Sequence, residues 1–293
     1  MASTQFAREG LPAPSPDDKA VSYWQQLALS YRAVGSPLKP TPEVVAFVEN
    51  AVKRFAGQRP KARMRAVLLG VTPSIAQIAW PEGTFLTAAD YSLDMVRGVW
   101  PGNVTGAREA VCANWRSLPL RPRSCDVVIG DGAMNCIRFP GEFRELADQI
   151  HAALNERGLA LLRCYAKPAH PEEPGDVFAD AARGAIPSFH QFKFRLLMAM
   201  QESTVEGVAV DAVYKMWKRR TMEDTRLCER AGWSRQEAAT IDLYCGSNTV
   251  HTFPTLAELQ SALAERFEEL EISCPSYALS ERCPILVLKR RNS

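Results

Sequence analysis

The sequence predicts an α/β fold in which helices cover both faces of a mostly parallel sheet. Residues 66–165 read as five successive units that alternate strand-like apolar runs with helical patterns. The runs are apolar on both faces, which is typical of parallel strands that lie between two layers of helices. The first run also ends at Gly70 and leads to Thr72 and Pro73, a helix start that can turn backbone amides towards a ligand.

Two helices are expected before the first strand. A pair of aspartates suits the N-cap of a helix over about 19–33, and Thr41 with a proline at the next position starts a second helix over 42–57. A proline-containing tail over residues 1–16 precedes them. We therefore expect residues 1–60 to form a tail and an N-terminal helical lid.

The strands and helices of the first half can be assigned from their apolar patterns. The expected strands cover residues 66–71, 84–89, 107–113, 126–129 and 159–165. Between them, helices are expected over residues 73–80, 92–100 and 141–155.

The alternation stops after the fifth strand. The segment is too long for a simple crossover, so we expect a helical insertion over residues 169–240 that caps the substrate pocket. Its helices are expected near 176–184, 189–202, 207–220 and 221–231, and they are followed by a helix over 255–266 and two strands, 268–274 and 284–290, that can pair antiparallel. The core of the fold would then comprise residues 61–168 and 241–293.

Composition excludes several functional classes. Lys and Arg total 35 against 33 Asp and Glu, which does not favour a nucleic-acid partner. No run approaches 18 uninterrupted apolar residues and the N-terminus has no signal pattern, so we expect a cytoplasmic protein without membrane segments. Eight cysteines without a C-x-x-C pair and four dispersed histidines favour reduced thiols and no metal site.

Acidic residues follow two of the expected strands. Asp90 lies about twenty residues beyond Gly70, where a carboxylate can accept both hydroxyl groups of a ribose. Asp131 lies between two glycines, and such a loop loses much backbone entropy unless a close approach requires it. In the insertion, His190 is a candidate base for a substrate proton, and Tyr165 at the tip of the fifth strand is another.

Each of these residues also has a purely structural interpretation. Gly70 suits any tight turn, and Asp90 suits a solvated strand end. Trp115 could pack in the core while its neighbour Asn114 serves the turn. A histidine beside phenylalanines, as at position 190, is more often buried than catalytic.

With its loops taken in order, the chain resembles the class I S-adenosylmethionine-dependent methyltransferases over roughly residues 40–290. The resemblance implies a Rossmann-like, seven-stranded, mostly parallel sheet with a closing antiparallel hairpin. It implies S-adenosylmethionine as cofactor and S-adenosylhomocysteine as product. The loops after strands one to four would hold the methionine part, the ribose, the adenine and the reacting methyl group. The implied cofactor-binding residues are Gly70, Val71, Thr72, Asp90, Tyr91, Met95, Asn114, Trp115, Asp131 and Gly132.

The first loop departs from the family pattern. Leu68 stands where the family has an acid, and residues 71–73 replace further glycines. Asp131 or a backbone carbonyl would then have to meet the ammonium group of the cofactor. For catalysis the candidates are Asn135, Tyr165 and His190, and for the lid and substrate they are Tyr23, Trp24, Tyr31 and Phe189.

Methyl transfer to a small, partly hydrophobic acceptor is the leading hypothesis. A second hypothesis keeps the cofactor but uses the sulfonium for another reaction, such as an intramolecular cyclisation. A third is a methyltransferase-like module that binds a ligand without chemistry. A nicotinamide dehydrogenase is disfavoured because Gly-x-Gly-x-x-Gly is missing after the first strand. The sequence makes no prediction of oligomeric state or of the acceptor atom.

Overall fold

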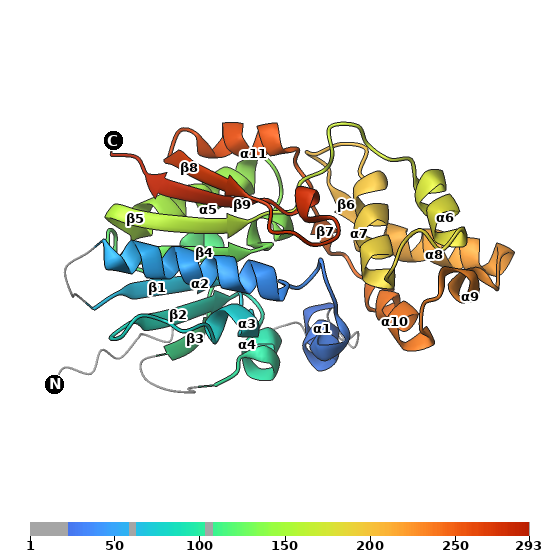
Figure 1. The fold of residues 1–293 in the computed structure, drawn as a ribbon, viewed down its shortest axis with the longest axis horizontal. Helices are drawn as coiled ribbons and strands as arrows, with labels where there is room; N and C mark the ends of the chain where they lie inside the picture. Colours follow the sequence, from blue (N-terminus) through green and yellow to red (C-terminus); the bar gives the residue numbers. More distant parts are fainter. Residues whose placement is uncertain (1–22, 59–62, 103–107, 293) are drawn as a thin grey trace.

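A seven-stranded sheet forms the centre of the protein (Figure 1). The computed structural model describes residues 23–58, 63–102 and 108–292. The strands of this sheet are β1 (Arg65–Leu69), β2 (Phe85–Asp90), β3 (Arg108–Cys112), β4 (Cys125–Asp131), β5 (Leu154–Arg163), β8 (Phe267–Ser273) and β9 (Ile285–Arg290).

The strand order β3-β2-β1-β4-β5-β9-β8 is that of a Rossmann-like sheet closed by a hairpin. Strands β1 to β5 are parallel to one another. Strand β9 runs antiparallel to both β5 and β8. The predicted seven-stranded, mostly parallel sheet with an antiparallel hairpin is therefore confirmed.

Successive side chains of β1 face opposite layers of helices, as the apolar run predicts. Ala66 and Leu68 lie in one buried cluster together with side chains of α2, whereas Val67 and Leu69 lie in another with side chains of α5 and α11. Figure 1 shows α2 on one face of the sheet and α5 and α11 on the other. The helices that pack on the sheet are α2 (Pro42–Gly57), α3 (Pro73–Ala76), α4 (Leu93–Val99), α5 (Gly141–Ala153) and α11 (Leu256–Leu263).

Two elements of the core differ in length from the expectation. The helix expected over 73–80 is the single turn α3, which ends at Ala76. Strand β5 begins at Leu154 rather than at 159, since α5 ends at Ala153 and the chain continues directly as a strand. The apolar pattern did not locate the boundary between α5 and β5, because the buried Leu154 fits an apolar position of a helix as well as of a strand.

The N-terminal helix α1 (Tyr23–Ser30) continues as a 3-10 turn over Tyr31–Ala33, within the helix expected over 19–33. Residues 19–22 and the tail lie outside the described residues. Helix α1 packs closely on α4, because a Cβ atom at Gly98 would lie only 3.2 Å from the Cβ atom of Ala28. Helix α1 therefore lies against α4, and its function as a lid stays a prediction.

Five helices occupy the segment after β5 and lie together at one end of the molecule (Figure 1). Their shared core is aromatic, with ring centroids 4.9 Å apart for Phe189 and Trp217 and 5.0 Å apart for Phe192 and Trp233. The helices are α6 (Pro174–Ala182), α7 (Phe189–Ala199), α8 (Val210–Glu223), α9 (Leu227–Ala231) and α10 (Arg235–Ala239).

The sequence did not predict a small second sheet, in which β6 (Val208–Ala209) pairs antiparallel with β7 (Val250–His251). Gly207, expected at the start of a helix, lies instead beside β7, where a Cβ atom would be 2.6 Å from the carbonyl oxygen of His251. A two-residue strand is too short to show an alternating pattern. The one sequence feature linked to the pairing of β6 with β7 is Gly207, which allows the two backbones to approach closely.

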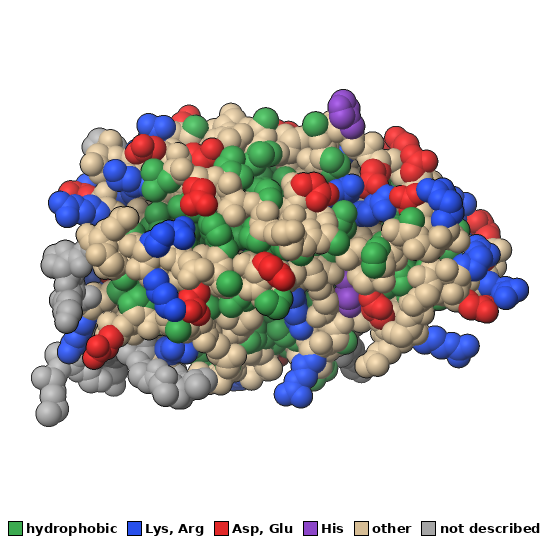
Figure 2. Space-filling view, in the orientation of Figure 1, with side chains coloured by type: hydrophobic (Ala, Val, Ile, Leu, Met, Phe, Trp, Pro, Cys, Tyr) green, Lys and Arg blue, Asp and Glu red, His purple; other side chains and the backbone are tan. Residues whose placement is uncertain are grey.

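The surface carries charges of both signs. In Figure 2, Lys and Arg side chains are intermixed with Asp and Glu over the visible face, in keeping with a net charge of +2. Within the described ranges, none of the helices has the length and apolar character needed to cross a membrane.

Candidate functional site

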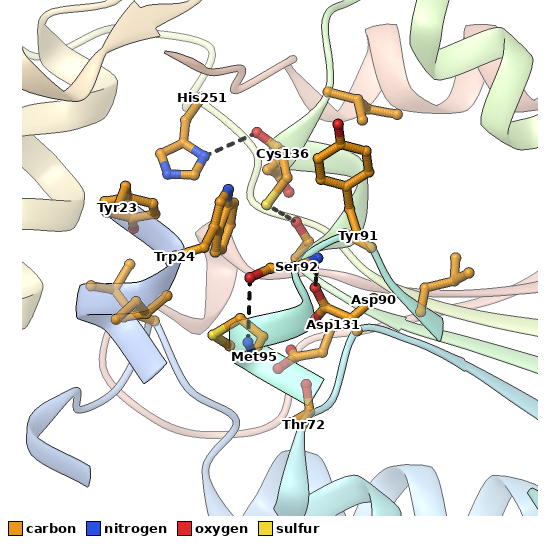
Figure 3. A pocket seen from close by; sticks show the side chains of 18 of the residues that line it. Tyr23, Trp24, Thr72, Asp90, Tyr91, Ser92, Met95, Asp131, Cys136 and His251 are labelled. Atoms are coloured by element: carbon orange, nitrogen blue, oxygen red, sulfur yellow. Dashed lines mark hydrogen bonds between the residues drawn. The ribbon is translucent and has the colours of Figure 1, made fainter. Parts of the chain in front are cut away.

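A pocket of about 390 Å³ opens where the carboxyl ends of the parallel strands meet α1 and α7. Loops after β1, β2, β3 and β4 form one side, and α1, α7 and the segment before α11 form the other. In Figure 3, Tyr23, Trp24 and His251 border one side, and Asp90 and Thr72 border the other. All ten residues that the resemblance implies for the cofactor line this pocket.

The turn after β1 requires a glycine. Gly70 has a φ angle of +92°, which L side chains rarely adopt, and its amide donates to the carbonyl oxygen of Ala89 over 2.7 Å. The backbone therefore turns sharply at the pocket edge, and Thr72 follows at the N-cap position of α3. Because α3 is only one turn long, its helix dipole is small. A ligand would therefore interact with this loop mainly through the backbone close to Gly70.

Asp90 at the tip of β2 is a buried carboxylate without a cationic partner among the described residues. Its side chain is 8% exposed, and Oδ1 accepts a hydrogen bond from the Ser92 amide over 2.8 Å. Burial raises the pKa of the carboxyl to about 6, while hydrogen bonds from the Ser92 and Val71 backbone act in the opposite direction. The carboxylate thus has acceptor capacity that a ligand's hydroxyl groups can use.

Trp115 forms a rigid aromatic wall beside Asp90 and Gly70. Its Nε1 atom donates to the carbonyl oxygen of Ala89 over 2.6 Å, the same oxygen that accepts from Gly70. The preceding Asn114 accepts a hydrogen bond from the Arg116 amide and caps the short 3-10 turn. Both residues line the pocket. Asn114 also stabilises the turn, which is the structural role considered for it from the sequence.

Asp131 at the end of β4 forms a buried ion pair with Arg163 at the end of β5. The Oδ1 atom of Asp131 lies 2.6 Å from Nη1 of Arg163, and the side chains are 5% and 2% exposed. Arg163 also donates to the carbonyl oxygen of Pro37 over 2.5 Å and to the Tyr277 hydroxyl over 3.3 Å. Arg163 therefore ties the loop before α2 to the sheet and offsets the charge of Asp131.

Gly132 lets the loop after β4 pass against Tyr165. Its φ angle is +68°, and a Cβ atom there would lie 2.9 Å from the Tyr165 ring. We expect Gly132→Ala to lower the free energy of unfolding by about 1–3 kcal/mol, measured by urea denaturation. The matched control is Gly141→Ala at the start of α5, where nothing lies within 4 Å, and it should leave stability unchanged or slightly raised. Equal stabilities of the two variants would contradict this reading of Gly132.

Asn135 lines the pocket, and its side chain forms hydrogen bonds with the backbone of two other segments. Its Nδ2 atom donates to the carbonyl oxygens of Tyr165 and Thr252 over 2.8 and 2.7 Å, and its Oδ1 atom accepts from the Tyr165 amide over 2.8 Å. These bonds join the ends of β4, β5 and β7. The amide is thereby held in one orientation and is largely occupied within the protein.

Two residues of the insertion that the sequence analysis singled out lie outside the pocket lining. His190 packs against Gly35, where a Cβ atom would be 2.6 Å from its ring, and burial followed by the charge of Lys193 lowers its pKa to about 4. Phe189 belongs to the aromatic core of the insertion. Neither residue is among those that line the pocket, so the proposed roles of His190 in catalysis and of Phe189 at the substrate stay predictions from sequence.

The remaining wall is aromatic and includes residues that sequence reasoning missed. Tyr23, Trp24 and Tyr31 from the lid line it as expected. Ring centroids of Tyr23 lie 6.0 Å from Tyr244 and 6.3 Å from His251. The missed lining residues include Ser92, Cys136, Lys193, Tyr244, His251 and Phe253.

No protein-family model matches the sequence, and no curated protein sequence matches it. Solved structures match the fold at low identity. The CurJ carbon methyltransferase is 12% identical with a TM-score of 0.53 over 90% of this chain, which spans 58% of that chain's length. The 1,6-didemethyltoxoflavin-N1-methyltransferase of Burkholderia thailandensis, solved with 1,6-didemethyltoxoflavin and S-adenosylhomocysteine bound, is 11% identical with a TM-score of 0.52 over 97% of this chain and 94% of its own.

A Rhodobacter sphaeroides protein assigned to the Zn-dependent alcohol dehydrogenases also matches, with 11% identity and a TM-score of 0.59 over 92% of this chain and 97% of its own. At such identities the likeness concerns the fold alone. Together with the strand order, the two methyltransferase neighbours show that the chain has a Rossmann-like fold of the kind that class I methyltransferases also have.

Proposed function

We propose that this protein is an S-adenosylmethionine-dependent methyltransferase that acts on a small, partly hydrophobic molecule. The observation that carries the proposal is Asp90, a buried carboxylate beside the Gly70 turn whose recorded partners are backbone amides. A carboxylate at the tip of the second strand of such a sheet is placed to bind a ribose diol. Burial raises its pKa, and hydrogen bonds from two hydroxyl groups would oppose that effect by stabilising the carboxylate.

The other lining residues fit the rest of the cofactor. Trp115 offers a fixed ring for adenine, and the backbone near Gly70 offers space for the methionine part. The Oδ2 atom of Asp131 carries no hydrogen bond from the described residues, whereas Oδ1 binds Arg163, so Oδ2 is available to the cofactor's ammonium group. S-adenosylhomocysteine in the Burkholderia thailandensis neighbour supports the same choice of cofactor.

The chemistry needs positioning more than proton transfer. When bound, the cofactor supplies a methyl group already activated by a sulfonium. The lid residues Tyr23, Trp24 and Tyr31 would exclude water and present aromatic faces to a positive charge. Tyr165 is a less suitable base, because burial raises the pKa of its phenol well above the ordinary value.

Calorimetry tests the proposal directly. We expect S-adenosylmethionine and S-adenosylhomocysteine to bind the full chain with micromolar or tighter affinity and NADH not to bind. Turnover with a small-molecule extract as acceptor should yield S-adenosylhomocysteine, whereas the alternative cyclisation would yield methylthioadenosine. Absence of binding by both sulfur ligands would refute the proposal.

The affinity for S-adenosylhomocysteine should depend on pH through Asp90. Because the carboxylate form accepts the ribose hydroxyls and its pKa is about 6, we expect affinity to fall by up to about tenfold for each pH unit below 6. Burial also lowers the pKa of His251 in the same pocket from its ordinary value.

The stability of the free protein should respond to Asp90 in the opposite direction. An unfolded Asp titrates near about 4, so between about 4 and 6 the folded chain binds this proton more tightly, and stability from this group rises as the pH falls. Calorimetry and urea denaturation at pH 5 to 8 measure both trends, with Asp90→Asn as the control that lacks them. A wild-type affinity that is flat across pH 6 would contradict the prediction.

A further inference from the structure

Lys193 on α7 is a buried ammonium that borders the pocket. The residue is 1% exposed, yet it belongs to the pocket lining. Its Nζ atom donates to Oγ1 of Thr240 over 2.8 Å and lies 5.4 Å from the ring centroid of Tyr244 and 5.8 Å from that of Phe189. The hydroxyl of Thr240 is the only hydrogen-bond acceptor recorded for Nζ in the described part of the chain, although an ammonium has three donors.

The charged and titratable groups around Lys193 do not neutralise it. Glu237 on α10 acts on it only at a distance, since its Oε1 atom accepts from the Phe189 amide over 2.8 Å. His190 on the same helix, whose pKa is lowered to about 4, is neutral at ordinary pH. Tyr244 also stays neutral because burial raises its pKa. Among the described residues, Lys193 forms no ion pair.

Without a partner the charged form of Lys193 is unfavourable, and an anionic ligand would stabilise it. A buried charge without a partner destabilises a protein, and burial, opposed by the charge of Glu237, lowers the pKa of Lys193 to about 7. The pocket around it is apolar and aromatic, with Tyr23, Tyr244 and Phe253 in its lining. An oxygen anion on an aromatic or apolar ligand would accept the unused donors and supply the missing charge.

We propose that Lys193 binds the methyl acceptor and that this acceptor presents an anionic oxygen, a carboxylate or a phenolate, to Nζ. The proposal rests on the methyltransferase function proposed above, and it names the class of acceptor. The insertion thus contributes the acceptor subsite, while the loops after β1, β2 and β3 contribute the cofactor subsite. The neighbouring Thr240 holds the amine in place.

The test uses benzoate and 4-nitrophenolate as anionic probes and nitrobenzene as an uncharged probe. With the wild-type protein saturated with S-adenosylhomocysteine, calorimetry should detect at least one anion binding more tightly than nitrobenzene. Lys193→Met should weaken that anion at least tenfold and leave the affinities for nitrobenzene and S-adenosylhomocysteine unchanged. The preferred anion identifies whether a carboxylate or a phenolate is the group recognised.

A matched control separates this site from surface charge. Lys218→Met removes a half-exposed lysine of α8 that pairs with Asp242 over 3.1 Å, and it should leave anion binding unchanged. Equal anion affinities in wild type and Lys193→Met, or no preference of the wild type for either anion, would overturn the proposal. The anion titration is also repeated without S-adenosylhomocysteine, so that the anion-binding result does not depend on cofactor binding. Failure of S-adenosylhomocysteine to bind would count against the proposed function and not against the role of Lys193.

A measurement on the wild type alone removes any dependence on the folding of the variant. Anion binding requires the protonated amine, so the affinity for benzoate should fall as the pH is raised from 7 to 10, while that for nitrobenzene stays constant. A benzoate affinity that is constant over this range would also overturn the proposal.

Discussion

Replacing Asp90 with alanine is expected to weaken the binding of S-adenosylhomocysteine by about 100-fold, or roughly 3 kcal/mol. The carboxylate would lose two hydrogen bonds to the ribose, and hydrogen bonds to a charged group contribute about 1.5–3 kcal/mol each. Asp90 forms no ion pair with any described residue, so its removal should not unfold the sheet. Loss of the desolvated carboxylate and loss of its hydrogen bonds from the Ser92 and Val71 amides have opposite effects on stability, so we expect the free variant to stay folded.

Calorimetric titration of the variant measures this effect, with urea denaturation to show that the protein is folded. The control is Asp94→Ala, which changes a half-buried carboxylate on the neighbouring helix α4 that does not line the pocket. Its affinity should stay within about twofold of the wild type, because the charge it removes is partly screened by solvent. If Asp90→Ala binds as tightly as Asp94→Ala, the ribose is not held by Asp90.

The sheet could be predicted because its determinants are local. Each strand is an apolar run, and parallel strands bring their carboxyl ends to one edge, so the loops that follow Leu69, Asp90 and Asp131 had to meet. For this reason the ten residues implied for the cofactor all line one pocket.

The insertion was harder to predict for a physical reason. Helix α7 is buried on nearly all sides, so its sequence does not reveal which side faces a ligand. His190 and Lys193 are one helical turn apart, yet only Lys193 reaches the pocket. His251 was missed because its strand has two residues and is fixed by pairing with β6 across the insertion.

The departure of the first loop from the family pattern also has a structural explanation. Leu68 is fully buried in the cluster under α2, where an acid would be desolvated without a partner. The acid proposed here for the ammonium group is instead Asp131, and Arg163 binds one of its two oxygens. The sequence indicated Asp131 by its flanking glycines, but Arg163 was hidden inside an apolar strand.

Replacing Arg163 with methionine is expected to be the most destabilising single change, lowering the free energy of unfolding by about 3–5 kcal/mol. It would leave the carboxylate of Asp131 buried without its partner, 2.6 Å away in the wild type. It would also remove the hydrogen bond to the carbonyl oxygen of Pro37 that holds the lid connection to the sheet. Urea denaturation of the wild type and of the variant measures the difference in their free energies of unfolding.

A double variant separates the ion pair from the lost packing. Asp131→Asn with Arg163→Met removes both charges, so we expect at least half of the lost stability to return, as a buried charge without a partner is the costly species. Arg226→Met serves as the surface control: its pair with Glu229 is more than two-thirds exposed on both sides and should contribute less than about 1 kcal/mol. A double variant less stable than Arg163→Met would contradict this explanation. Arg163 would then stabilise the protein mainly through its hydrogen bonds to Pro37 and Tyr277, and the unpaired charge of Asp131 would not be destabilising.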